Sequence, residues 1–278
     1  MNIDPVTITI LVDNYAGDGL SAEHGLSLWI EAGNRRILLD TGQGGALAPN
    51  AEKLGIDLSM ADSLVLSHGH YDHTGGVSWA IRNAPEMEVF CHPAAVVPRY
   101  GMRAGESKPL GMTGESLWAL ESLSSRRNHW IQAMRVLFPG IGLTGYIPRR
   151  TDYENTGGAF FLDPELRRPD PIDDDSALWI NTAEGLIVCV GCCHAGLVNT
   201  LNQALFQSGA AKLKAVIGGF HLLNADDSRI ENTVKALRYL SPELIVPCHC
   251  TGSKAVDVMA DAFGSGVRSG CSGASFTF

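Results

Sequence analysis

A cluster of metal-ligating residue types constrains the fold of this chain more than any other feature of its sequence. Three histidines and one aspartate lie within six residues, at His68, His70, Asp72 and His73. The apolar segment before them, Ser63–Ser67, predicts a buried strand, and the segment after them, Thr74–Asn83, has helical periodicity. A loop that follows a strand can direct all four side chains toward one point, as a metal site requires. Imidazole and carboxylate ligands favour zinc, iron or manganese over calcium or magnesium.

The rest of the chain alternates strands with helices in two halves, residues 1–92 and 176–278. In the first half we predict further strands over Val6–Val12, Leu26–Glu31, Arg35–Asp40 and Glu88–Cys91, and a helix over Ala46–Leu54. In the second half we predict strands over Ala177–Thr182, Gly185–Val190, Ala215–Ile217, Leu244–Val246 and Ala274–Phe278, and helices over Gly196–Gln207, Ser228–Leu240 and Ser253–Phe263. We therefore predict an α/β fold and one domain, residues 1–278.

The segment between the halves, residues 93–175, has a weaker pattern. It is rich in proline, glycine and arginine, and it contains one predicted helix, Glu115–Arg126. This composition favours an irregular insertion that covers a site or mediates assembly.

Charge and cysteine usage narrow the class of protein. The 21 Lys and Arg against 30 Asp and Glu give a net charge of −9. Binders of nucleic acid or membrane surfaces need a cationic face, so we expect neither partner and a small molecule instead. The first twelve residues lack the basic region of a signal peptide, and the adjacent Cys192 and Cys193 do not suit a disulfide framework. We expect a cytoplasmic protein with reduced thiols, and a homo-oligomer as is common among soluble enzymes.

Two motifs in the second half repeat the arrangement of a strand, a loop and a helix. Residues 191–194 read Gly-Cys-Cys-His, and residues 247–250 read Pro-Cys-His-Cys. The cysteines also admit a structural zinc site made from Cys189, Cys192, Cys248 and Cys250. Because Cys189 lies inside a predicted strand, that alternative is the weaker one.

At this point the motifs resemble a known family. His68-x-His70-x-Asp72-His73 resembles the metal-binding signature of the metallo-β-lactamase superfamily, and Leu38-Leu39-Asp40-Thr41-Gly42 resembles its first motif. The resemblance covers nearly the whole chain apart from the middle segment. It implies a four-layer αββα sandwich with two metals about a bridging hydroxide.

The same resemblance implies a set of metal ligands. The first metal would be bound by His68, His70 and His194, and the second by Asp72, His73 and His249. Asp40 would orient a ligand histidine through a hydrogen bond.

The chain departs from the family pattern at Cys192, where most members have an aspartate that bridges both metals. A cysteine can bind metal as a thiolate or can be a small buried residue, so one metal or two unequal ones are both open. We expect Asp173, Asp174 and Asp175 to form a solvated loop, although one of them could replace the missing carboxylate.

Further motifs resemble one branch of the superfamily, the 7,8-dihydropterin-6-methyl-4-(β-D-ribofuranosyl)-aminobenzene-5′-phosphate synthase-like proteins. These motifs are residues 144–149 (TGYIPR), 192–196 (CCHAG), 218–222 (GGFHL) and 247–252 (PCHCTG). We expect His221 to line the pocket as an acid, a base or a substrate contact. Arg149 is a candidate phosphate contact because guanidinium matches phosphate oxygens, although a solvated Arg149-Arg150 pair explains the sequence equally well.

These expectations give a metal-dependent hydrolase or lyase that acts on a small phosphate-bearing or otherwise anionic metabolite by means of a metal-bound hydroxide. Zinc is the default metal, as one or two ions, with iron or manganese as alternatives. Asp72 would accept a proton, and His221 would deliver one to the leaving group. Two other classes remain open: an iron-dependent redox enzyme on the same fold, and a metal-stabilised protein that binds a ligand without converting it.

Overall fold

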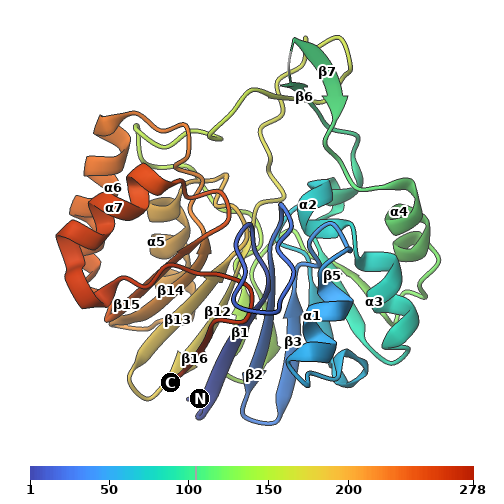
Figure 1. Ribbon diagram of the computed structural model, residues 1–278, viewed down its shortest axis with the longest axis horizontal. Helices are drawn as coiled ribbons and strands as arrows, with labels where there is room; N and C mark the ends of the chain where they lie inside the picture. Colours follow the sequence, from blue (N-terminus) through green and yellow to red (C-terminus); the bar gives the residue numbers. More distant parts are fainter. Residues whose placement is uncertain (104) are drawn as a thin grey trace.

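Successive residues of the central strands are buried on both sides, so that each of two β-sheets has two buried faces. The computed structural model describes residues 1–103 and 105–278, and in it the two sheets pack face to face with helices on the outside (Figure 1). One hydrophobic cluster lies between the sheets and includes Ile8, Ile30 and Ile180. Trp29 packs on the opposite side from Ile30, against the helices, as the two-residue period of a strand requires. The predicted four-layer αββα sandwich is confirmed.

The first sheet contains seven strands in the order β16-β1-β2-β3-β4-β5-β8. In chain order they are β1 (Val6–Val12), β2 (Ser27–Ala32), β3 (Arg35–Leu39), β4 (Ser63–Val65), β5 (Glu88–Cys91), β8 (Asn128–Trp130) and β16 (Ser275–Thr277). The helices of this half are α1 (Leu47–Lys53), α2 (Tyr71–Thr74), α3 (Val77–Asn83) and α4 (Gly114–Glu121). Strands β3, β4, β5 and β8 are parallel, so their carboxyl ends meet at one edge of the sheet.

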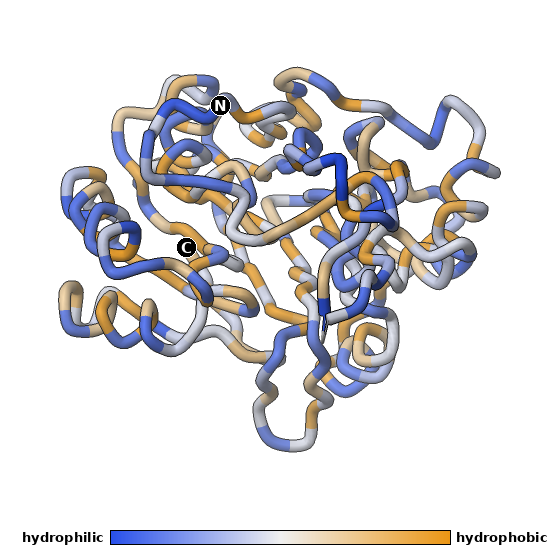
Figure 2. The backbone as a smooth tube through the Cα atoms, turned by 90° about the horizontal axis from the view of Figure 1, so that it is seen from above, coloured by the Kyte–Doolittle hydropathy of each residue, from blue (hydrophilic) through white to orange (hydrophobic). Residues whose placement is uncertain are grey.

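The second sheet contains six strands in the order β15-β14-β13-β12-β10-β9. In chain order they are β9 (Arg135–Phe138), β10 (Ile141–Leu143), β12 (Ala177–Thr182), β13 (Gly185–Val190), β14 (Leu213–Gly219) and β15 (Leu244–Cys248). Its outer face packs against α5 (Leu197–Ser208), α6 (Asp227–Leu240) and α7 (Ser253–Phe263). Hydrophobic and hydrophilic residues alternate along these helices, as expected for helices with one buried face (Figure 2). Strands β13, β14 and β15 are parallel and also end at one edge.

Part of the middle segment belongs to the two sheets themselves. Strand β8 extends the first sheet, and β9 and β10 extend the second. Strands β8 and β9 are three and four residues long and only partly buried, so they lack the apolar alternation that would predict them. The remainder forms a small sheet of β6 (Tyr100–Arg103), β7 (Glu106–Pro109) and β11 (Phe160–Phe161), and the β6–β7 hairpin projects above the sandwich in Figure 1.

Most predicted elements have the expected type, with differences at their ends. The predicted helix Thr74–Asn83 is divided into α2 and α3 at the Gly75-Gly76 pair, because glycine is a poor residue for a helix interior. Three short 3₁₀ helices, η1 (Leu58–Met60), η2 (Pro93–Val96) and η3 (Gly264–Gly266), were not predicted. Among the helices of the described residues, none combines the length and the apolar character that crossing a membrane would need.

We predict that residues 1–278 unfold as one unit, because the two halves of the chain share the hydrophobic cluster between the sheets. In urea, with metal removed by chelator, tryptophan fluorescence and far-ultraviolet circular dichroism should report the same transition midpoint. Two separate midpoints would show that the halves are independent domains.

Candidate metal centre

Five loops meet at the edge where the parallel strands of both sheets end. Asp40 follows β3, and the loop that contains His68, His70, Asp72 and His73 follows β4. From the second sheet, Cys192 and His194 follow β13, His221 follows β14, and His249 and Cys250 follow β15. The carboxyl edge of parallel strands is the usual place for a ligand site in such sheets, and here two sheets contribute to one site.

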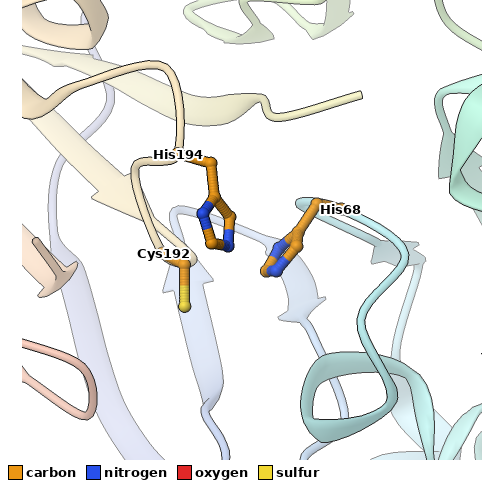
Figure 3. Close-up of side chains that lie close together, drawn as sticks. All are labelled: His68, Cys192 and His194. Carbon is orange, nitrogen blue, oxygen red and sulfur yellow. The ribbon is translucent and has the colours of Figure 1, made fainter. Parts of the chain in front are cut away.

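The predicted ligands converge. His68 Nε2 lies 2.9 Å from His70 Nδ1, and the ring centroids of His68 and His194 are 4.8 Å apart. The side chains of His68, Cys192 and His194 point toward one another from two different loops (Figure 3). Ligand atoms of these three residues lie within 4.8 Å of one another, and so do those of His73, Cys192 and His249. The structure thus offers two adjacent metal positions that share Cys192.

Outer hydrogen bonds orient four of the histidine rings. His73 Nδ1 donates to Asp40 Oδ2 (2.7 Å), His194 Nδ1 to the Thr156 carbonyl (2.9 Å), and His249 Nδ1 to Asn14 Oδ1 (2.8 Å). His68 Nδ1 lies 2.9 Å from Ser67 Oγ. Each bond occupies Nδ1 and leaves Nε2 directed toward the other ligands, which is how proteins fix the tautomer of a metal-binding histidine.

The donor set fits a divalent transition-metal ion. His70 Nε2 and His194 Nε2 are buried and have no hydrogen-bond partner among the residues that the structure describes. Burial lowers the pKa of His68 and of His194 well below its ordinary value, and burial together with the charge of Arg99 lowers the pKa of His70 to about 3. These rings are therefore neutral and have lone pairs free to bind a cation.

Asp72 lies between two histidines at the second position. Its Oδ2 is 3.1 Å from His24 Nε2 and 3.4 Å from His249 Nε2. Burial opposes ionisation, but the hydrogen bonds from His24 and His249 outweigh it and hold the pKa of Asp72 well below its usual range. A carboxylate that stays ionised is a good metal ligand and a weak base, so the structure favours the ligand role of Asp72 over its predicted role as a proton acceptor.

Asp40 connects the loops that follow β3 and β4, and it lies close to Gly191 in the loop after β13. It accepts bonds from Ser67 N and Ser67 Oγ as well as from His73. Its backbone has a φ of 58°, in the left-handed region that aspartate and asparagine tolerate. A Cβ at Gly191 would lie 2.0 Å from Ser67 Oγ, so a glycine is needed there for the two sheets to approach. The arrangement matches the orienting role predicted for Asp40.

Asp174 and Asp175 each anchor one ligand loop: Asp174 the loop after β4 of the first sheet, and Asp175 the loop after β13 of the second sheet. Asp174 Oδ2 accepts a bond from Gly69 N (2.7 Å), and Asp175 Oδ2 accepts one from Ala195 N (2.7 Å). The buried Arg99 compensates the charge of Asp174, and its Nε lies 2.8 Å from Asp170 Oδ2. The expectation of a solvated loop was therefore wrong for these two aspartates, because their carboxylates satisfy backbone amides that would otherwise be buried without partners.

The cavity beside the ligands has a volume of about 300 Å³ and is lined by His70, Asp72, Cys192, His194, His221, His249 and Cys250 together with Tyr71, Phe160, Leu223 and Arg103. His221 therefore lies where it was predicted. Arg103, from strand β6, lines this cavity among the described residues, whereas Arg149 does not. The Arg149 guanidinium instead donates hydrogen bonds to the carbonyls of Pro171 and His194. Arg149 therefore stabilises the loop that contains His194.

Four residues of the centre were not predicted: His24, Arg99, Arg103 and Cys250 as a neighbour of Cys192. His24 and Arg103 lie in segments without a motif, so the sequence carried no signal for them. Arg99 is one of several arginines in the middle segment, and only its burial distinguishes it. Cys250 belongs to the Pro-Cys-His-Cys motif of residues 247–250. Its contact with Cys192 could not be predicted, because the two cysteines are far apart in the chain.

We predict that Asp40→Asn weakens metal binding by about 10- to 100-fold, because the amide cannot hold His73 and Ser67 as the carboxylate does. Asparagine keeps the left-handed backbone, so the variant should fold. Competition with a chromogenic chelator measures the affinity, and the exposed Asp261→Asn is the control. An unchanged affinity would contradict the orienting role.

We predict that Arg99→Leu lowers the free energy of unfolding by about 3–5 kcal/mol, because it leaves two buried carboxylates without a cation. Urea unfolding measures the change. The exposed Arg167→Leu should change stability by less than about 0.5 kcal/mol. A loss of similar size in both variants would show that Arg99 does not anchor the loops.

Comparisons with known proteins agree with this geometry. A family model described as "Metallo-beta-lactamase superfamily" matches residues 21–196. The chain is 33% identical to 7,8-dihydropterin-6-methyl-4-(beta-D-ribofuranosyl)-aminobenzene-5′-phosphate synthase of Methanocaldococcus jannaschii, over 94% of this chain and 92% of that protein.

Solved structures show the same fold. Tm1679, described as a metal-dependent hydrolase of the beta-lactamase superfamily, is 30% identical with a TM-score of 0.80, and the match covers 98% of each chain. Zinc-bound PqqB from Methylobacterium extorquens is 10% identical with a TM-score of 0.60, over 97% of this chain and 99% of that one, which shows the fold alone. The predicted resemblance is confirmed, and the chain belongs to the metallo-β-lactamase superfamily.

Proposed function

We propose that the protein is a metal-dependent hydrolase or lyase that acts on a small phosphate-bearing or otherwise anionic metabolite. The observation that carries the proposal is the convergence of oriented histidines, Asp72 and Cys192 beside a cavity of about 300 Å³. That volume is at the lower end of the range for small-molecule sites. The name of the M. jannaschii relative contains a 5′-phosphate, and Tm1679 is described as a hydrolase, which supports both parts of the proposal.

We propose zinc as the default metal, as one or two ions, because nitrogen, sulfur and carboxylate ligands in close proximity suit it. His68, His70 and His194, whose rings lie together, would hold the first ion, and Asp72, His73 and His249 the second. Ligand atoms of Cys192 lie within 4.8 Å of those of His68 and His194 and of those of His73 and His249. A divalent cation bound there supplies an activated water at neutral pH and neutralises negative charge that develops on the substrate. The seven cysteines are free thiols in the described structure, which supports a cytoplasmic location.

Arg103 is the candidate that we propose for binding the anionic group of the substrate, in place of Arg149. Its Nη1 lies 3.3 Å from the Tyr71 hydroxyl, and its guanidinium carbon is 5.9 Å from the centroid of the Tyr71 ring. Tyr71 thus holds the guanidinium at the cavity while most of its donors stay free. A guanidinium matches the oxygen geometry of phosphate.

His221 is the proposed proton donor to the leaving group. Its ring lines the cavity, with its centroid 4.3 Å from that of His194 and 6.0 Å from that of Phe160. His221 follows β14 of the second sheet and is outside the histidine cluster, so it could reach a bound substrate from that side of the cavity. Phe160 and Leu223 provide apolar surface that excludes water from the same space.

We predict that Arg103→Ala raises KM for a phosphate ester by about tenfold or more, because a charged hydrogen bond is lost, while kcat changes less. The matched control is Lys108→Ala, a cation on the same hairpin that pairs with Glu106. Steady-state kinetics on the best substrate found in a screen measures both. Equal effects of the two variants would show that only the general charge of the hairpin matters.

The proposed function is tested by a screen of phosphate monoesters, cyclic phosphodiesters and chromogenic bis(4-nitrophenyl) phosphate with zinc-loaded and manganese-loaded protein. We expect turnover that chelator abolishes and added metal restores. Native iron with oxygen consumption would instead favour the redox class. Stabilisation by a phosphorylated ligand without any product would favour a binding protein.

A further inference from the structure

A second group of metal-ligating side chains lies beside the histidine cluster. Cys192 Sγ and Cys250 Sγ are 3.2 Å apart, and both residues are buried. A ring nitrogen of His221 completes a set of three ligand atoms that lie within 4.8 Å of one another. All three residues line the cavity. The proposed function assigns no ligand role to Cys250 or to His221.

The three residues come from adjacent parts of one sheet. They follow the parallel strands β13, β14 and β15, whereas the His68–His73 loop comes from the first sheet. Their arrangement therefore comes mainly from the second sheet, and Cys192 Sγ also lies 3.1 Å from His73 Nε2 of the first sheet. Cys192 is the one residue common to this group and to the two histidine positions.

The backbone around His221 is adapted to place its ring there. His221 has a φ of 48°, a left-handed conformation that is unfavourable for a residue with a side chain of this size. A Cβ at Gly157 would lie 2.0 Å from His221 Cδ2, so only a glycine at 157 leaves room for the ring. His221 Nδ1 is buried without a hydrogen-bond partner in the described structure. A strained backbone that places a ring with an unpartnered nitrogen in this position points to a ligand that binds there.

The donor types select the kind of ligand. Two thiols and one imidazole form a soft donor set that suits zinc, cobalt or cadmium and disfavours magnesium, calcium and manganese. A contact between two cysteine sulfurs makes only a weak hydrogen bond, so it contributes little to stability by itself. A thiophilic cation would bind both sulfurs strongly.

We propose that Cys192, Cys250 and His221 form a separate thiolate-rich position for a thiophilic divalent cation, next to the histidine and aspartate ligands. Cys192 is the thiolate at the boundary between this position and the others. On binding, each thiol releases its proton to solvent and each sulfur donates an electron pair to the cation, without any change of oxidation state. The proposal concerns metal binding alone and does not depend on the substrate. A cation held here would occupy His221, so His221 could not donate a proton to a leaving group in the same state.

The test is a titration of reduced, metal-free protein with Co²⁺ under anaerobic conditions, followed by ultraviolet and visible absorption. We expect a near-ultraviolet thiolate-to-cobalt charge-transfer band. Cys250→Ser should lower this band by about half, because one of two thiolate ligands is lost. His70→Ala removes a ligand of the histidine cluster alone, so it should keep most of the band while losing bound cobalt elsewhere.

Two further variants keep the result interpretable. Cys248→Ala is the matched control, because Cys248 lies in the same segment but packs in the core between the sheets, and it should leave the band unchanged. His221→Asn keeps both thiols and should weaken the cobalt affinity read from the band by about tenfold or more. Circular dichroism of each metal-free variant checks folding, and His221→Asn decides the question if Cys250→Ser does not fold.

Three results would overturn the proposal. One is the absence of any charge-transfer band in the unsubstituted protein. Another is a band that Cys250→Ser and His221→Asn both leave unchanged, which would make Cys192 a ligand of the histidine cluster only. The third is loss of the band in His70→Ala, which would show that the thiols bind no metal without that cluster.

Discussion

The Asp40 carboxylate makes three hydrogen bonds that join the loops following β3 and β4 at the site: two with Ser67 and one with His73. It is fully buried, and a buried carboxylate is costly unless its oxygens are satisfied by donors in good geometry. The same bonds fix the direction of His73 and, through Ser67, of His68. The local demand to satisfy one buried charge therefore sets the orientation of two metal ligands.

The same principle recurs at the other ligand loops. Asp174 and Asp175 satisfy the amides of Gly69 and Ala195, and Arg99 supplies the compensating charge. Burial lowers the pKa of His68, His70 and His194, so these three rings are neutral and can bind a cation, whereas Asp40 raises the pKa of His73 against the effect of burial. The net charge of −9 would not prevent the proposed anionic substrate from binding, because a bound cation and Arg103 would set the local charge of the site.

Motifs that combine residue type with a strand-end position were read correctly from the sequence. His68, His70, His194 and His249 converge as expected, since the parallel strands that precede them end at one edge. The roles of residues that depend on contacts between distant parts of the chain could not be predicted from motifs. Arg99 and Asp174 are 75 positions apart in the chain, and Cys192 and Cys250 are 58 apart. The sequence left the role of Arg149 open, because a phosphate contact and a guanidinium that binds backbone carbonyls cannot be told apart from the residue type alone.

The central claim is that these loops form a metal centre, and elemental analysis of protein purified without added metal or chelator tests it most directly. The account predicts at least one equivalent of zinc or another transition metal per chain, retained through gel filtration. Folded protein that contains no metal, and that takes up none when dialysed against zinc, would contradict it.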